Sequence, residues 1–207
     1  MDWHSEASRL YAILDSSCFP DALHLFQAAD ELVRAGVLIV QYRNKNGIAR
    51  EMLAHARELQ ARTGSPAKLI MNDRADLCLA AEFDGVHVGQ DDLSPESARK
   101  VVGPKRLLGV STHNPEQVAD ADLMPVEYIA VGPVFSTTSK ANPDPVIGLA
   151  GVRRARELTH KPLVAIGGIT RGNCRSVIDA GADSVAVISD LVRETGKSAE
   201  EFLQILG

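Results

Sequence analysis

The hydrophobic positions of the chain fall into eight short runs that are nearly continuous rather than alternating. The runs are rich in β-branched residues and lie at residues 10–14, 37–41, 69–71, 85–88, 107–110, 128–131, 163–166 and 185–188. A strand with one face in water alternates apolar and polar residues, whereas a strand buried on both faces does not. The pattern therefore predicts eight strands of a parallel sheet that is covered on both faces.

Segments with helical periodicity separate these runs. Helices are expected over 22–36 and 52–64, and each segment ends on a glycine suited to a C-cap. The segment 94–103 opens with Ser94 as its N-cap and Pro95 at the first helical position. Further helical segments are 114–123, 150–159, 173–181 and 190–206.

Eight strand-and-helix units in series are typical of a closed (β/α)₈ TIM barrel. The chain has 207 residues, so each unit averages about 26 residues and the barrel would be a compact one. The alternative is a doubly wound open sheet, but no GxGxxG segment follows the first predicted strand. No linker or change of composition divides the chain, so we predict a single α/β domain over residues 1–207.

The composition narrows the classes of function. Hydrophobic residues make up 45% and charged residues 24%, as is usual for a globular protein. A formal net charge of -5 and an aromatic content of 4% argue against nucleic acid or an anionic membrane as partner. No apolar run approaches a membrane span, and the three separated cysteines form neither a disulfide framework nor a zinc motif. We expect a cytoplasmic protein that acts on small molecules, and a homo-oligomeric state is left open.

Polar residues follow nearly every predicted strand. In a barrel of this type the active site is built from the loops that follow the strands. In chain order these ends are Asp15, QYRNK (41–45), ND (72–73), GQDD (89–92), STH (111–113), GPVFSTTSK (132–140), GGIT (167–170) and ISD (188–190). They predict one polar cavity at that end of the barrel.

The last two strand ends indicate a phosphate site. Two glycines in GGIT (167–170) would let the backbone approach a phosphate closely, and the following helix N-terminus would add N–H donors. Ile188 and Ser189, after the eighth predicted strand, would complete the site. A tight turn that needs only positive φ angles is the alternative.

Two acids, Asp73 and Asp92, end neighbouring strands of the expected barrel. Paired carboxylates without a general-base pattern suit Mg²⁺, which takes one or two carboxylates together with substrate phosphates and water. Asp91 is a near neighbour that could substitute. For each acid alone a helix N-cap is the alternative, but the pairing favours a metal site.

Three cations, Arg43, Lys45 and Lys140, flank the acids in chain order. Cations and a divalent metal around one cavity imply a polyanionic ligand, and a diphosphate fits. A nucleophilic triad is not indicated, because Ser111 and His113 are only two residues apart and no acid is placed to orient the histidine. A hydrogen-bonding role is expected for Ser111.

Taken in this order and spacing, the motifs resemble those of thiamine-phosphate synthases, the family that joins the pyrimidine and thiazole halves of vitamin B1. The resemblance runs from Tyr11 to the ISD segment (188–190) and rests on QYRNK, LIMNDRADLCLAAEFDGVHVGQDDL, GVSTHNPEQ, GPVFSTTSK, VAIGGIT and GADSVAVIS. The family pattern T-x-T-K ends here in Ser139-Lys140, which keeps the hydroxyl. Tyr42 stands where an aliphatic residue is commoner, and Phe83 where a small residue is usual.

The resemblance implies a role for each motif. The aminopyrimidine diphosphate would be held by Gln41, Arg43, Lys45, Asn72, Ser111 and Lys140, of which Arg43, Lys45, Ser111 and Lys140 would be catalytic. Tyr42 and Asn44 belong to the same substrate-binding segment, although alternation turns them away from Gln41, Arg43 and Lys45. Asp73 and Asp92 would bind Mg²⁺. The thiazole phosphate would be held by Thr137, Thr138, Ser139, Gly168, Ile188 and Ser189.

The implied reaction joins 4-amino-2-methyl-5-hydroxymethylpyrimidine diphosphate to hydroxyethylthiazole phosphate, giving thiamine phosphate and diphosphate. Mg²⁺ and the cations would stabilise the departing diphosphate, and the electron-rich ring would support a methylene carbocation, so no protein nucleophile is needed. A thiazole tautomerase, a phosphosugar isomerase and a non-catalytic binder of thiamine precursors are alternatives. The joint presence of two acids and three cations argues against the tautomerase and the binder. The isomerase would need an acid–base pair at strand ends 1 and 6, and strand 6 ends in GPVFSTT without one.

Overall fold

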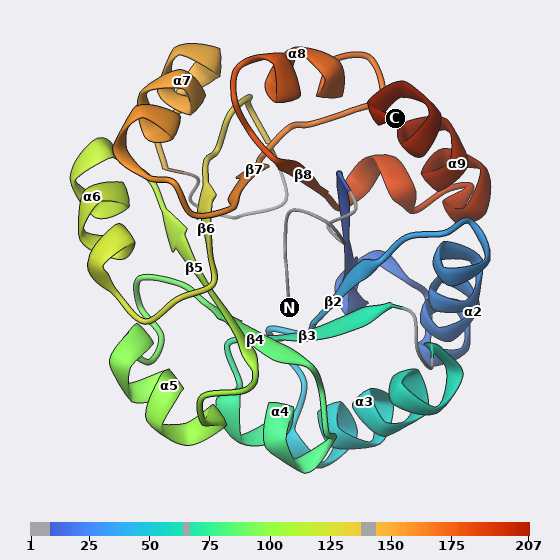
Figure 1. The fold of residues 1–207 in the computed structure, drawn as a ribbon. Coiled ribbons are helices and arrows are strands. Elements are labelled where there is room, and N and C mark those ends of the chain that lie inside the picture. Colours follow the sequence, from blue (N-terminus) through green and yellow to red (C-terminus); the bar gives the residue numbers. More distant parts are fainter. Residues whose placement is uncertain (1–8, 64–66, 138–143) are drawn as a thin grey trace.

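The chain folds into a closed barrel of eight parallel strands ringed by helices (Figure 1). The structure, a computed structural model, describes residues 9–63, 67–137 and 144–207. Each strand pairs with the next in sequence, and β8 closes the barrel on β1. The strands are β1 Leu10–Asp15, β2 Ile39–Arg43, β3 Lys68–Asn72, β4 Gly85–Val88, β5 Leu107–Thr112, β6 Tyr128–Val131, β7 Leu163–Ile166 and β8 Ser184–Val187. The predicted (β/α)₈ fold is confirmed.

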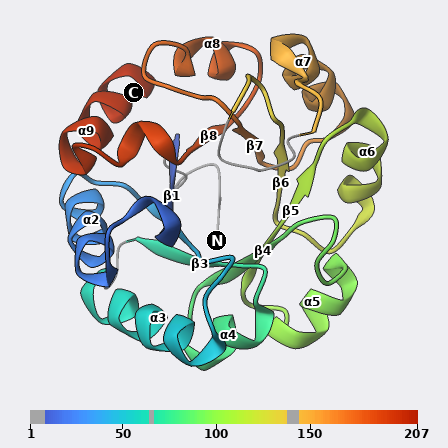
Figure 2. The ribbon, with the colours of Figure 1, turned by 180° about the vertical axis from the view of Figure 1, so that it is seen from behind.

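The helices form an outer ring that Figures 1 and 2 show from opposite sides. They are α2 Ala22–Arg34, α3 Ala49–Thr63, α4 Ala75–Ala80, α5 Pro95–Val102, α6 Pro115–Leu123, α7 Gly148–Leu158, α8 Cys174–Asp179 and α9 Thr195–Leu206, with 3₁₀ turns η1 Ser16–Cys18 and η2 Ser189–Leu191. Ser94 caps α5 as predicted, because its side chain accepts a hydrogen bond from the backbone N–H of Ser97 at 3.3 Å. Gly36, just after α2, has φ 93°, the left-handed conformation expected there.

One helix start and one additional helix differ most from the prediction. The last helix begins at Thr195 rather than near residue 190, because residues 189–191 form the separate turn η2. The six-residue helix α4 was not among the predicted segments, and its shortness leaves little periodicity to detect. The glycine expected to end α3, Gly64, lies outside the described residues.

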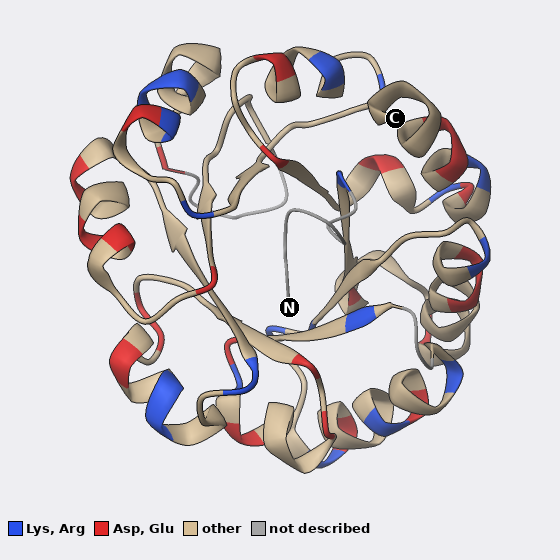
Figure 3. Cartoon of the chain, viewed as in Figure 1, with Lys and Arg blue, Asp and Glu red and all other residues tan. Residues whose placement is uncertain are grey.

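The core has two apolar layers. The larger lies between the strands and the helices, and it includes the ring of Phe83, which is 1% exposed. The smaller fills the barrel interior and consists of Tyr11, Ile13, Ile39, Ile70, Leu107, Tyr128, Ala130, Val164 and Ala186. Acidic and basic residues are interspersed over the outer helices (Figure 3). None of the described helices is long and apolar enough to span a membrane.

The amino-terminal end of the barrel is held by carboxylates that precede three even-numbered strands. Each accepts a hydrogen bond from a backbone N–H of the preceding odd-numbered strand: Asp84 from Leu69 at 2.9 Å, Glu127 from Leu108 at 2.7 Å and Asp183 from Leu163 at 2.7 Å. Each also pairs with a cation, namely Lys68, Arg99 and Arg156. We call each of these carboxylates with its cation a clamp. Their charge-assisted hydrogen bonds stabilise the amino-terminal end of the barrel, opposite the polar strand ends.

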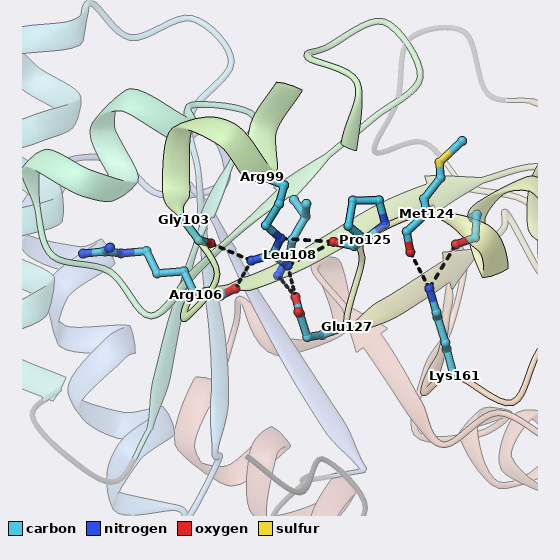
Figure 4. A network of polar contacts seen from close by, with 9 residues as sticks. Arg99, Gly103, Arg106, Leu108, Met124, Pro125, Glu127 and Lys161 are labelled. Carbon is cyan, nitrogen blue, oxygen red and sulfur yellow. Dashed lines mark hydrogen bonds and ion pairs between the residues drawn. The ribbon is translucent and has the colours of Figure 1, made fainter. Parts of the chain in front are cut away.

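Figure 4 shows the central clamp. Arg99 reaches Glu127 and also donates to the carbonyls of Gly103 and Arg106, at 2.8 and 2.7 Å. Lys161 donates to the carbonyl of Met124 at 2.6 Å. Arg99 thus ties the C-terminal end of α5 to the starts of β5 and β6, and Lys161 ties the end of α6 to the start of β7.

Candidate active site

A cavity of about 400 Å³ opens at the carboxyl ends of the strands. The predicted site residues in its wall are Gln41, Arg43, Lys45, Asn72, Asp73, Asp92, Ser111, Thr137, Gly168, Ile188 and Ser189. They come from seven of the eight strands or the loops that follow them, so closure of the barrel brings distant segments together. Three further predicted residues, Thr138, Ser139 and Lys140, lie outside the described residues.

The side chains of the segment at the end of β2 lie in two different environments. Gln41, Arg43 and Lys45 line the cavity. The side chain of Tyr42 points the other way into the layer under the helices, where its hydroxyl bonds Nδ1 of His55 at 3.0 Å. Asn44 donates to that hydroxyl at 3.2 Å. The alternation is as predicted, and the inclusion of the Tyr42 and Asn44 side chains in the substrate-binding wall is corrected.

Arg43 is held from behind by a buried acid. Asp15 ends β1 opposite Arg43 in the strand register, and its Oδ2 pairs with the guanidinium. Its Oδ1 accepts from the backbone N–H and the hydroxyl of Ser17, at 3.0 and 2.7 Å. The sequence shows Asp15 as a polar strand end but assigns it no role. The structure makes it the residue that orients Arg43.

Asp73 and Asp92 face each other across the ends of β3 and β4. Lys45 forms an ion pair with Asp73. Burial, together with the neighbouring carboxyl group of Asp92, raises the pKa of Asp73, and Lys45 only partly opposes the shift. Asp73 has φ 62°, a left-handed backbone that is uncommon for a residue other than glycine and typical of functional sites.

The alternative role of these acids as helix caps is wrong. Arg74 occupies the N-cap position of α4, and Ser94 caps α5. Asp92 instead accepts the backbone N–H of Gly89 at 2.8 Å, within its own loop. Both carboxylates are therefore available to the cavity rather than consumed by helix termini.

The acid pair suits a hard divalent cation. In the part of the chain that the structure describes, no group of three or more His, Cys, Asp and Glu side chains is arranged as a metal cage. The carboxylates of Asp73 and Asp92 repel each other, and this repulsion contributes to the raised pKa of Asp73. A cation bound between them would offset the repulsion. Two protein oxygens leave coordination positions for substrate oxygens and water, as Mg²⁺ prefers.

The two glycines after β7 are required by the turn, and their conformation is also compatible with an anion site. Gly167 and Gly168 have φ 103° and 62°, so the turn does need glycine. A Cβ on Gly168 would also lie 2.4 Å from the carbonyl oxygen of Ser136. No described residue accepts a hydrogen bond from the backbone N–H of Gly168 or Ser189, and both residues line the cavity. These two N–H groups are the donors that an anion would meet.

The expected contribution of the following helix is smaller than predicted. The backbone N–H of Thr170 already donates to Asn173 at 2.8 Å, and that of Arg171 donates to Asp190 at 2.8 Å. The helix α8 begins only at Cys174. The guanidinium of Arg171 also donates to both carboxylate oxygens of Asp190, at 3.1 Å each. These bonds fix the loops after β7 and β8 relative to each other.

A chain of hydrogen bonds runs through the cavity wall, and all of its members except Tyr128 line the cavity. It links Gln41 to Tyr11 at 2.8 Å, Tyr11 to Tyr128 at 2.9 Å, Tyr128 to Nδ1 of His87 at 3.0 Å, and Nε2 of His87 to Ser111 at 2.8 Å. Burial lowers the pKa of His87 to about 4, so the imidazole is neutral near pH 7. The three ring residues were not predicted as a network. Their only signal in the sequence is a polar group inside an apolar run.

The Ser111–His87 pair does not make a nucleophilic triad. The group behind His87 is the phenol of Tyr128 and not a carboxylate. His113 is engaged elsewhere: its Nδ1–H donates to the carbonyl of Gly132 at 2.7 Å, and its Nε2 lies 3.5 Å from Asp144. Ser111 is therefore placed to form hydrogen bonds rather than to attack a substrate.

Comparison with known proteins places this geometry in a family. The family model described as thiamine monophosphate synthase matches residues 10–191. A thiamine-phosphate synthase of Koribacter versatilis is 62% identical over 201 residues, which are 96% of this chain and 95% of that protein. One of Chloroflexus aurantiacus is 42% identical, over 93% of this chain and 86% of the relative. The solved thiamine phosphate pyrophosphorylase of Pyrococcus furiosus has a TM-score of 0.85 at 33% identity, covering 95% and 94% of the two chains.

Proposed function

The chain belongs to the thiamine monophosphate synthase family, and from this membership we propose how its cavity binds two substrates and joins them. Its activity is that of a thiamine-phosphate synthase, a transferase of thiamine biosynthesis. The substrates we propose are 4-amino-2-methyl-5-hydroxymethylpyrimidine diphosphate and hydroxyethylthiazole phosphate.

One observation supports the proposal: groups that could bind anions line the cavity on two facing sides of the barrel. Arg43, Lys45 and the acid pair belong to β2, β3 and β4, whereas Gly168 and Ser189 follow β7 and β8. In a ring of eight strands, β3 and β7 are diametrically opposed. Two phosphorylated substrates would thus be anchored at opposite sides with their reacting atoms between them.

The diphosphate is assigned to the side of β2 to β4. Arg43 presents a guanidinium that Asp15 holds in place, and Lys45 adds a second cation next to Asp73. Mg²⁺ bound by Asp73 and Asp92 would supply further positive charge to the diphosphate as it departs. Lys140, which lies outside the described residues, is proposed as a third cation on the strength of its motif.

The thiazole phosphate is assigned to the side of β7 and β8. Its oxygens would accept from the N–H groups of Gly168 and Ser189, where a side chain on residue 168 could not be accommodated. Thr137 faces the same cavity, and Thr138 and Ser139 are assigned to this phosphate from their motif alone. The Arg171–Asp190 contact keeps the two loops in register.

The chemistry then needs positioning and charge stabilisation rather than a protein nucleophile. The bond between the pyrimidine methylene and the diphosphate oxygen breaks, and its electron pair leaves with the diphosphate. The aminopyrimidine ring stabilises the resulting cation, and the lone pair of the thiazole nitrogen forms the new C–N bond. No proton has to be removed, which agrees with a site in which burial lowers the pKa of His87 to about 4 and so makes its imidazole a weak base.

The test is a reconstitution with the purified protein, both substrates and Mg²⁺, in which thiamine phosphate and diphosphate are quantified by chromatography. We expect equal amounts of the two products with Mg²⁺ and neither in excess chelator. Absence of thiamine phosphate in the presence of metal would refute the proposal. Rearrangement of the thiazole alone would then favour the tautomerase, and binding without turnover would favour the precursor-binding protein.

A further inference from the structure

We infer that Tyr11, Tyr128 and His87 are positioning residues that fix, through one continuous hydrogen-bond chain, which atoms Gln41 and Ser111 present to the pyrimidine. The inference rests on the proposed function, since it assumes that the pyrimidine lies against Gln41 and Ser111. None of the three residues needs to touch the reacting atoms. Their effect would pass through the two residues at the ends of the chain.

The chain crosses the barrel interior rather than following one strand. Its five members stand on β2, β1, β6, β4 and β5 in the order Gln41, Tyr11, Tyr128, His87 and Ser111. The four links are 2.8 to 3.0 Å long. The rings also contact each other: those of Tyr11 and Tyr128 meet edge to face at 5.9 Å, and those of Tyr128 and His87 stack at 5.5 Å.

A glycine reserves the space that this arrangement needs. Gly109 on β5 pairs in register with His87 on one side and with Tyr128 on the other. A Cβ at that position would lie 2.0 Å from Cζ of Tyr128. The two rings can therefore meet across β5 only because residue 109 has no side chain. A polar chain packed this closely is a defined part of the site rather than an incidental contact.

We assign the bonds the one direction in which each hydroxyl of the network both accepts and donates. The amide nitrogen of Gln41 donates to the hydroxyl of Tyr11. In this assignment the hydroxyl of Tyr11 gives its own proton to Tyr128, and Tyr128 donates to Nδ1 of His87. A neutral imidazole that accepts at Nδ1 carries its proton on Nε2, so His87 donates to the oxygen of Ser111.

The two residues at the ends of the hydrogen-bond network therefore present opposite groups to the cavity, one an acceptor and the other a donor. Gln41 keeps its carbonyl oxygen as an acceptor for the cavity, and Ser111 keeps its hydroxyl proton as a donor. An aminopyrimidine offers the complement, an exocyclic amino group that donates beside a ring nitrogen that accepts. The chain thus selects the orientation of the ring, and with it the direction in which the methylene faces the thiazole.

Removing the hydroxyl of Tyr128 should disturb the orientation of the pyrimidine without unfolding the protein. In Tyr128→Phe, Nδ1 of His87 loses its donor, and the imidazole can take its other tautomer. Nε2 would then accept the proton of Ser111, which would no longer point into the cavity. The matched control is Tyr42→Phe, because Tyr42 is equally buried and hydrogen-bonded but lies on the outer side of the barrel.

The experiment is a steady-state comparison of wild type, Tyr128→Phe, Tyr11→Phe and Tyr42→Phe, with each substrate varied in turn. For Tyr128→Phe we expect kcat/KM for the pyrimidine diphosphate to fall about tenfold, as for loss of one buried hydrogen bond. The KM for the thiazole phosphate should stay within about twofold, since that site is remote. Tyr42→Phe should show wild-type kinetics at a similar thermal stability.

Epistasis separates a positioning role from a merely structural one. In a Ser111→Ala background, Tyr128→Phe should cost less than about a further twofold, because the residue through which it acts is already gone. Equal losses for both substrates, a multiplicative effect with Ser111→Ala, or wild-type kinetics would overturn the inference. Tyr11→Phe tests the same chain if Tyr128→Phe does not fold. A wild-type protein that makes no thiamine phosphate would overturn the proposed function itself, together with this inference.

Discussion

Asp15→Asn is a sharp test of how the site holds Arg43. The carboxylate of Asp15 uses Oδ1 for the two bonds from Ser17 and Oδ2 for the guanidinium. Asparagine has a single oxygen, so either Ser17 or Arg43 must face an amide NH₂ group, donor against donor. The substitution keeps the size of the side chain and removes the charge. Its effect is therefore electrostatic rather than a matter of packing.

The expected magnitude follows from the burial of the pair. A hydrogen bond between charged groups contributes about 1.5–3 kcal/mol. The side chain of Asp15 is 4% exposed but that of Arg43 is 20% exposed, so we take the lower part of that range, about 1.5–2 kcal/mol. For a chain of this length the loss in Tm is about 3–8 °C. If the same energy is lost from the contact of Arg43 with the diphosphate, kcat/KM for that substrate falls about 10- to 30-fold.

Asp84→Asn provides the matched control. Asp84 also divides its two oxygens between a cation and a second donor: Oδ1 accepts from Lys68 at 3.1 Å and Oδ2 from the backbone N–H of Leu69 at 2.9 Å. It lies at the opposite end of the barrel, so it should lower Tm without changing kcat/KM. Thermal unfolding and steady-state kinetics on both variants separate the two effects. A lowered Tm with unchanged kinetics in Asp15→Asn would show that Asp15 only stabilises the fold.

Four further outcomes are expected. Asp73→Ala and Lys140→Ala should each remove most turnover while the circular dichroism spectrum is unchanged, and wild-type rates in either would contradict its assignment. Chelation with EDTA should stop product formation and excess Mg²⁺ should restore it; full activity in chelator would exclude a metal role. Gly168→Ala should raise the KM for the thiazole phosphate at least about tenfold, because a left-handed backbone costs about 1–2 kcal/mol and the Cβ would lie 2.4 Å from a carbonyl oxygen; an unchanged KM would count against the phosphate position. Glu127→Ala should lower the urea unfolding free energy by about 1–2 kcal/mol, since it leaves the N–H of Leu108 without its acceptor and Arg99 without an ion pair whose carboxylate is 40% exposed, and kcat should not change; a stability loss below about 0.5 kcal/mol would refute the clamp.

The strand count and the identity of most cavity residues follow from local pattern. Eight continuous apolar runs can be buried on both faces only in a layered parallel sheet, and the polar residue after each run must then lie at one end. The placement of Gln41, Arg43 and Lys45 in the cavity needs only the alternation of a strand. These features depend on spacing along the chain, which is why the sequence is sufficient for them.

The two interior tyrosines show what the sequence does not decide. Tyr11 and Tyr128 both lie in apolar runs and face the barrel interior, whereas their equally apolar neighbours Leu10, Ala12 and Ile129 pack under the helices. A run without alternation does not indicate which side chains point into the barrel and which point toward the helices. That direction is set by the stagger of the strands when the barrel closes.

The partners of the charged residues were also decided by tertiary structure. Asp15 meets Arg43, and Asp73 meets Asp92, only because neighbouring strands end side by side. The sequence by itself determined that a barrel forms and which side chains gather at its mouth. Closure of the barrel decided which of them touch, because the contacts that orient Arg43 and link Gln41 to Ser111 join residues far apart in the chain.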